Sequence, residues 1–119
     1  MNKTFTKTLE IPKNELEKWN KLLQRDDIDY DKEGFGKYET VWCRTVKFDD
    51  GCEIDIKVCS DAPEDHDLWC EAVLFDSRGW QLDMTDACWG LDGEWNMSFI
   101  DHNGKESKRT NYKVIIKEI

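Results

Sequence analysis

The sequence predicts an α+β fold in which one N-terminal helix packs on a five- to six-stranded antiparallel β-sheet or a partly closed barrel. A single segment near the N-terminus repeats its apolar residues at helical spacing. The rest of the chain alternates between apolar and polar residues, and Gly-containing turns at residues 50–51 and 103–104 separate the expected strands. The predicted order is one strand, the helix and six further strands, and with a single helix we expect no parallel βαβ units.

The chain has 119 residues, and we expect one domain over residues 1–119 because no repeat, low-complexity tract or linker divides it. No stretch approaches the ~18 consecutive apolar residues of a membrane span. The first residues also lack the apolar segment of a signal peptide. These observations predict a cytoplasmic protein that does not contact a membrane.

The first two expected elements are a strand over residues 4–11 and a helix over residues 13–24. The strand carries three apolar residues on one face: Phe5, Leu9 and Ile11. Pro12 suits the first turn of the helix, where a missing N–H costs nothing. The helix presents an apolar stripe to a core, formed by Leu16, Trp19, Leu22 and Leu23.

The first hairpin is predicted to turn through the three residues 49–51, with Gly51 in a left-handed conformation. A three-residue loop pairs apolar residues with one another: Phe48 with Cys52, Val46 with Ile54 and Trp42 with Val58. It also places Lys47 opposite Glu53 on the other face. A two-residue turn would instead put Lys47 opposite Ile54.

Two further hairpins follow by the same reasoning. A four-residue loop over 76–79 pairs Phe75 with Trp80, and Val73 with Leu82. The last hairpin joins residues 94–100 to residues 112–119, and residues 105–110 extend either the loop or the strand. Its inward side chains are expected to be Trp95, Met97, Phe99, Tyr112, Val114 and Ile116.

The net charge is −9, and residues 34–103 carry sixteen acidic and five basic residues, a net charge of −11. A protein this acidic repels phosphate backbones, which argues against direct nucleic-acid binding. Solubility alone would explain the charge. The alternative is a face that attracts cationic surfaces, including the basic grooves of proteins that bind nucleic acids.

No pattern in the sequence predicts a metal site, a cofactor or catalytic residues. The five cysteines include no CxxC pair, so we expect reduced thiols, several of them buried. The acidic loop over 27–34 resembles the start of a calcium loop, but Lys32 replaces its glycine and Tyr38 its bidentate carboxylate. The acidic residues around His66 are more simply a polar loop, and nucleophile and phosphate-loop motifs are missing. We therefore expect a protein that is not an enzyme.

Six tryptophans are the most unusual feature of the composition. Four have inward parity and are expected in the core: Trp19, Trp42, Trp80 and Trp95. The side on which Trp69 lies is left open by the pattern. Trp89 falls in a loop among carboxylates, where it is either a lid on one end of the barrel or an exposed binding residue.

The hairpin residues 45–48, 50–59 and 72–76, with Gly79 and the Leu-Asp-Gly-Glu segment 91–94, resemble a diffuse group of small bacterial proteins. Many members of this group are carried on phages and other mobile elements. The resemblance covers roughly the middle half of the chain. It implies a genomic neighbourhood and carries no catalytic residues over to this chain.

The leading hypothesis is a non-enzymatic acidic binding protein of phage or mobile-element type. In its specific form it is an anti-defence, anti-CRISPR-like inhibitor that occupies a basic nucleic-acid-binding surface of a partner protein. The expected binding carboxylates are Glu53, Asp55, Asp83, Asp92 and Glu94. The alternative is a small-ligand module, either a nucleotide sponge or a carbohydrate binder, that uses Trp89 and the nearby acids.

Overall fold

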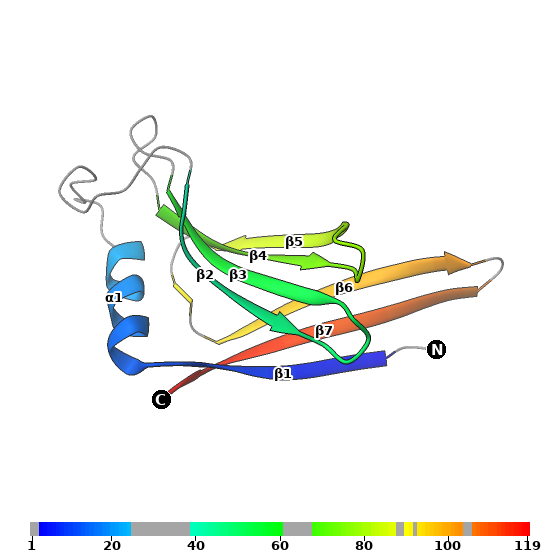
Figure 1. Cartoon of the computed structure of the whole chain (residues 1–119), viewed down its shortest axis with the longest axis horizontal. Coiled ribbons are helices and arrows are strands. Elements are labelled where there is room, and N and C mark those ends of the chain that lie inside the picture. The colour runs from blue at the N-terminus through cyan, green and yellow to red at the C-terminus, as the bar shows by residue number, and fades with distance from the viewer. Residues whose placement is uncertain (1–2, 25–38, 61–67, 88–89, 92, 104–105) are drawn as a thin grey trace.

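The computed structural model describes residues 3–24, 39–60, 68–87, 90–91, 93–103 and 106–119. The elements follow in the order β1 (Lys3–Ile11), α1 (Lys13–Leu23), β2 (Glu39–Lys47), β3 (Glu53–Ser60), β4 (Leu68–Phe75), β5 (Gln81–Ala87), β6 (Glu94–Asn103) and β7 (Glu106–Glu118) (Figure 1). Seven of these eight described elements are strands, so the described part of the molecule is mostly β.

The predicted fold class is wrong, because the strands form two separate sheets. One sheet has three strands in the order β1-β7-β6, and the other has four in the order β2-β3-β4-β5. All described pairings are antiparallel except that of β1 with β7, which is parallel. The alternation of apolar residues locates each strand, but it does not identify the partner of a strand that lies far away in sequence. The 11-residue helix therefore accompanies a two-sheet β structure.

The two sheets enclose one core to which both contribute buried side chains. Phe5 of β1 stacks on Tyr112 of β7 (ring centroids 5.7 Å apart), and Phe48, after β2, meets Tyr112 edge-on at 5.1 Å. The hydroxyl of Tyr112 donates a hydrogen bond to Asp50 Oδ2 (2.7 Å) and lies 3.3 Å from Cys52 Sγ. Tyr112 therefore connects the three-stranded sheet to the first hairpin of the four-stranded sheet.

The helix α1 lies at one end of the sheets (Figure 1). Its predicted apolar stripe is confirmed, since Leu16, Trp19, Leu22 and Leu23 are all buried. Glu15 accepts hydrogen bonds from the Trp42 indole N–H and from the guanidinium of Arg44, both on β2. Two polar bonds therefore attach the helix to the four-stranded sheet in addition to its apolar face.

The predicted register of the first hairpin is confirmed. Val46 pairs with Ile54, Lys47 with Glu53, and Trp42 with Val58. The Phe48 N–H donates to the Cys52 carbonyl (2.9 Å), and Gly51 has a φ of 91°.

The predicted register of the second hairpin is wrong, and so is the inward position of Trp80. The loop has three residues, because the Asp76 N–H donates to the Trp80 carbonyl (2.9 Å). Phe75 then pairs with Gln81, and after a bulge Val73 pairs with Met84. Trp80 is 68% exposed as a result.

The last hairpin is longer than predicted and projects beyond the four-stranded sheet (Figure 1). Trp95, Met97, Tyr112 and Val114 are buried as predicted. Phe99 is exposed instead of buried, and it follows Ser98, the last residue of β6 with a described backbone bond to β5. We call residues 99–103 of β6 together with 106–110 of β7 the arm.

Candidate binding surface

The predicted acidic residues lie on different surfaces of the molecule. Glu53 and Asp55 are on β3, on the face of the four-stranded sheet that points away from the core, since Ile54 and Ile56 between and beyond them are buried. Glu94 is on the outer face of the other sheet, because its neighbour Trp95 is buried. The outer faces of two packed sheets point in opposite directions, so one continuous face cannot hold all three.

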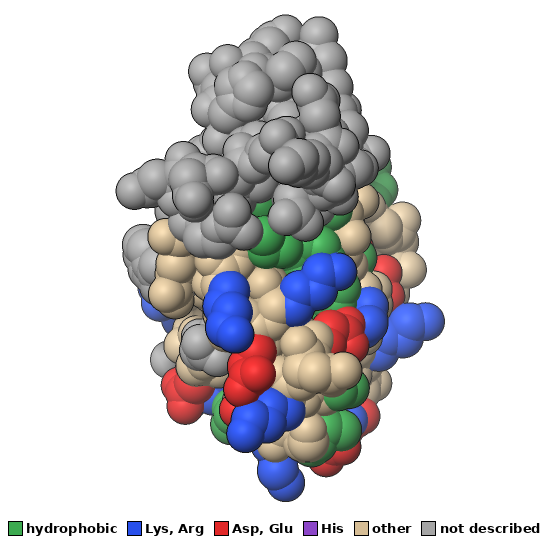
Figure 2. Space-filling view, turned by 90° about the vertical axis from the view of Figure 1, so that its left-hand side faces the viewer, with side chains coloured by type: hydrophobic (Ala, Val, Ile, Leu, Met, Phe, Trp, Pro, Cys, Tyr) green, Lys and Arg blue, Asp and Glu red, His purple; other side chains and the backbone are tan. Residues whose placement is uncertain are grey.

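Two more of the predicted binding residues, Trp89 and Asp92, lie outside the described residues. Figure 2 shows the end of the molecule that carries α1, where basic and acidic side chains are interspersed. This end therefore does not present a surface of uniform negative charge.

Two of the predicted carboxylates do come together, along the line where β5 and β6 lie side by side. Each of these strands is the last in its sheet, and no ladder joins them in the described structure. We call this line the seam. Two hollows open along it, of about 360 Å³ and about 280 Å³, and they share Asn96. Asp83 lines the first hollow, while Glu94 and Asp86 line the second.

Asp83 connects the two sheets at the seam. Its Oδ2 accepts a hydrogen bond from the backbone N–H of Ser98 on β6 (3.2 Å), and its Oδ1 accepts one from the N–H of Met84 (2.9 Å). The carboxylate thus satisfies a backbone donor that would otherwise face an unpaired strand edge.

The other seam carboxylates differ in their surroundings. Glu94 forms an ion pair with Lys113 of β7 (3.4 Å) and remains half exposed. Asp86 has Glu71 as its cross-strand neighbour on β4. Because like charges directly opposite each other destabilise a sheet, Asp86 has no evident role in stabilising this pairing.

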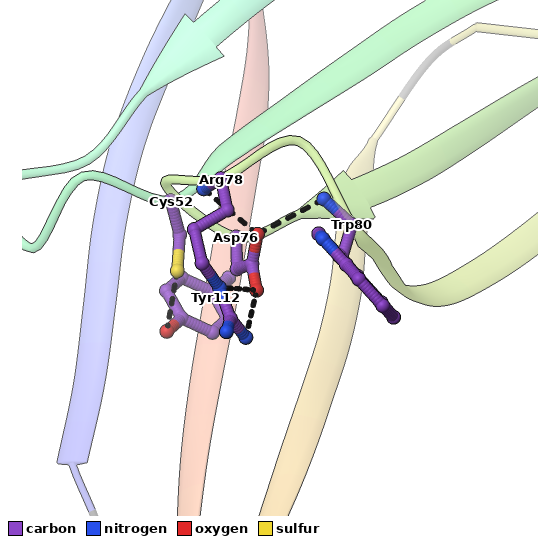
Figure 3. A network of polar contacts seen from close by, with 5 residues as sticks. All are labelled: Cys52, Asp76, Arg78, Trp80 and Tyr112. Carbon is purple, nitrogen blue, oxygen red and sulfur yellow. Dashed lines mark hydrogen bonds and ion pairs between the residues drawn. The ribbon is translucent and has the colours of Figure 1, made fainter.

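The turn before β5 displays a tryptophan and an arginine that the sequence pattern did not identify (Figure 3). Asp76 Oδ1 accepts the backbone N–H groups of Arg78 and Trp80, each at 2.9 Å. Its Oδ2 accepts two guanidinium N–H groups of Arg78. The bond from the Trp80 N–H and those from Arg78 lower the pKa of the Asp76 carboxyl.

Figure 3 shows that Trp80 points away from Tyr112 and Cys52. The Arg78 guanidinium lies 5.6 Å from the Trp80 ring centroid, within the range of a cation–π contact. Gly79, with a φ of 87°, closes this loop as Gly51 closes the first. Gly79 at the third position of the loop was therefore the signal for a three-residue loop. That loop length sets the register in which Trp80 is exposed.

Most of the exposed large apolar side chains in the described structure lie on or next to β5 and β6. Among the described residues, five large hydrophobic side chains are exposed, and four of them lie on or next to β5 and β6: Trp80, Met84, Phe99 and Ile100. Trp and Arg are also the residue types that contribute most often to binding energy at protein interfaces. Carboxylates and hollows thus lie along the seam, with exposed Met84 and Trp80 on or next to β5 and exposed Phe99 and Ile100 on the arm.

The thiols of the described residues are unsuited to nucleophilic chemistry. Cys52, Cys59 and Cys70 are buried, as predicted for several of the cysteines, whereas Cys43 is exposed. Burial, followed by the hydrogen bond to Glu71 (3.1 Å), raises the pKa of Cys59 to about 12. Burial also raises the pKa of Cys43 and of Cys52. A protonated thiol is a poor nucleophile and a poor metal ligand.

Across the described ranges, no group of three or more His, Cys, Asp or Glu side chains is placed to hold a metal ion. No helix in the described part of the chain is both long and apolar enough to cross a membrane. Comparisons of the chain with protein-family models, curated proteins and solved structures find no match.

Proposed function

We propose that this protein is a non-enzymatic cytoplasmic binding protein whose acidic seam binds a basic surface of a partner protein. In the specific form of the proposal, the partner is a nucleic-acid-binding protein of a host defence system, and this chain occupies its nucleic-acid site. The observation that carries the proposal is the seam itself, where Asp83, Asp86 and Glu94 line two adjoining hollows beside the last strands of the two sheets.

The electrostatics of the seam support a cationic partner. Three carboxylates line the hollows, and one ammonium group, that of Lys113, stands among the lining residues. Exposed carboxylates attract basic surfaces over the ~8 Å at which physiological salt screens charge. Trp80 and Arg78 next to the seam would supply the short-range contacts that steering charges do not.

A small polar ligand is the second candidate, and the larger hollow favours it. Its volume of about 360 Å³ lies at the lower end of known ligand sites. The lining offers amide and hydroxyl groups from Thr4, Asn96, Ser98 and Asn111 beside Lys113. A single cation suits a neutral ligand such as a sugar better than a nucleotide phosphate chain.

The proposal is tested with a synthetic peptide that alternates lysine with threonine, titrated into isotopically labelled protein. We expect backbone amide shifts on β5 and β6, and an affinity that falls steeply between about 0.05 and 0.5 M salt. The triple variant D83N/D86N/E94Q should weaken binding about tenfold or more. The matched control E10Q/E17Q/E118Q removes the same charge from exposed residues elsewhere.

Equal weakening by the two triple variants would mean that net charge alone attracts the peptide, and the seam proposal would fail. An absence of peptide binding at low salt would also contradict the seam proposal. The second candidate is examined by adding monosaccharides to the same sample. Saturable shifts at Asn96 and Asn111 that are insensitive to salt would favour a small-ligand module instead.

A further inference from the structure

Among the described residues, no strand pairs with the outer edge of β6 in the arm. Ser98 is the last residue of β6 whose described backbone hydrogen bond reaches β5, through Asp83. Beyond Ser98 the strand continues for five residues to Asn103, past the end of the four-stranded sheet (Figure 1). A strand edge of this kind can pair with another strand.

Two hydrogen bonds establish which backbone groups of the arm face this open edge. The Ile116 N–H donates to the Gly93 carbonyl (3.0 Å), so odd-numbered residues of β6 direct their backbone groups toward β7. The Ser98 N–H points instead to Asp83, which is the pattern expected of even-numbered residues. The N–H and C=O groups of Ile100 and His102 therefore point outward.

We propose that β6 pairs with β6 of a second copy of this chain in antiparallel fashion, with Ile100 opposite Ile100 about a two-fold axis. In this register the two Ile100 residues exchange two N–H to C=O hydrogen bonds. The His102 N–H of each copy reaches the Ser98 carbonyl of the other. The two three-stranded sheets then form one continuous six-stranded sheet.

The neighbouring registers are less favourable. A shift toward the tip places Asp101 opposite Asp101, and like charges directly opposite each other are destabilising. A shift in the other direction places Phe99 opposite Phe99 and brings the second copy over Met97, next to β5. Centring on Ile100 avoids both problems and covers two side chains that are each 37% exposed, Ile100 and its counterpart in the other copy.

The charge distribution favours a second copy over a basic partner at this position. The chain as a whole has a charge of −9, so two copies repel each other wherever carboxylates predominate. Residues 99–110 carry two acidic and three basic residues, so the arms can approach without this repulsion. The pairing involves few residues, which predicts a weak dimer that depends on protein concentration.

The test compares the full-length wild type with I100P and K47P by sedimentation equilibrium over a range of concentrations. Proline at position 100 removes an N–H that makes no bond within the arm ladder, so the hairpin keeps its bonds to β7. Proline at position 47 removes an outward N–H from the open edge of β2, because the Phe48 N–H is the one that bonds to the Cys52 carbonyl.

We expect a monomer–dimer equilibrium for the wild type and for K47P, and a dissociation constant raised about tenfold or more in I100P by the loss of two hydrogen bonds. Amide hydrogen exchange gives a reading that does not depend on the proline variants. The exchange of Ile100 and His102 should slow as the wild-type concentration rises, while that of Lys47 should not change. A wild type that stays monomeric at its highest soluble concentration would overturn the proposal, as would equal dimerisation of I100P or equal loss of dimer in K47P.

Discussion

At the scale of single residues, two buried proton donors, Cys59 and Tyr112, each lie beside a carboxylate. Cys59 is buried although it lies on the outer face of the four-stranded sheet, and it donates its S–H to Glu71 Oε1. Tyr112 is likewise buried, and burial followed by the contact with Cys52 raises the pKa of its hydroxyl. Ionising either group in the folded state would place a negative charge beside a carboxylate.

These raised pKa values predict a loss of stability at alkaline pH. The unfolded chain releases the Cys59 proton near pH 9, whereas the folded protein retains it until about pH 12. Unfolding therefore becomes easier as pH rises through this window, by at most about 1.4 kcal/mol per pH unit for one proton. We expect C59S to unfold with a shallower pH dependence between pH 9 and 12, measured by urea titration at each pH.

The comparison at neutral pH is the control, since the thiol is protonated in both states there. The remaining slope of C59S should reflect Cys43, Cys52 and Tyr112, whose pKa values are raised in the same direction. Parallel curves for C59S and wild type above pH 9 would contradict this account of Cys59.

At the scale of elements, two hairpin loops share one design and differ in their surroundings. Gly51 and Gly79 both have a φ near 90°, a conformation that costs an L-amino acid about 1–2 kcal/mol. A Cβ at Gly79 would meet no heavy atom within 4 Å, whereas a Cβ at Gly51 would lie 3.0 Å from Ser77 Cβ. The first loop is thus packed against the second.

This difference predicts unequal effects of the same substitution. G79A should lower the free energy of unfolding by about 1 kcal/mol through backbone strain alone. G51A should cost more, because the contact with Ser77 adds to the strain. The double variant G51A/S77G should recover the additional loss, as measured by chemical denaturation. Equal losses in G51A and G79A would show that the two loops do not press on each other.

At the scale of the whole molecule, the helix depends on a few contacts for its attachment. Glu15 is partly buried and bonds to both Trp42 and Arg44 on β2, while Glu17, two residues later, is exposed. Asn20 Oδ1 accepts the N–H of Leu91 (2.7 Å), which fixes the same helix to the segment before β6. Loss of Glu15 would leave the Trp42 indole N–H without this acceptor.

We therefore expect E15A to lower the free energy of unfolding by about 1–3 kcal/mol. E17A makes the same change of residue type on the same helix and should stay within about 0.5 kcal/mol of wild type. Urea denaturation followed by tryptophan fluorescence measures both. If E15A and E17A behaved alike, the contacts of Glu15 with β2 would contribute nothing to stability.

The candidate site was predictable only in part. Asp83 and Glu94 were expected from their charge, but the sequence gives no reason to group them with Asp86 while separating them from Glu53 and Asp55. That grouping depends on which strands are the last in their sheets. Trp80 was expected in the core, and a loop one residue shorter than predicted places it on the surface.

The sequence by itself determined the local structure: the helix stripe, the register of the first hairpin and most of the buried residues. These features depend on side-chain periodicity and turn residues over a few positions. The tertiary structure decided that the strands divide into two sheets and that β1 pairs in parallel with β7, more than 100 residues away. An alternating strand can bury its apolar face against many partners, and the local pattern is the same for each. The choice among them follows from covering both sheets and the helix at once, which is a property of the whole chain.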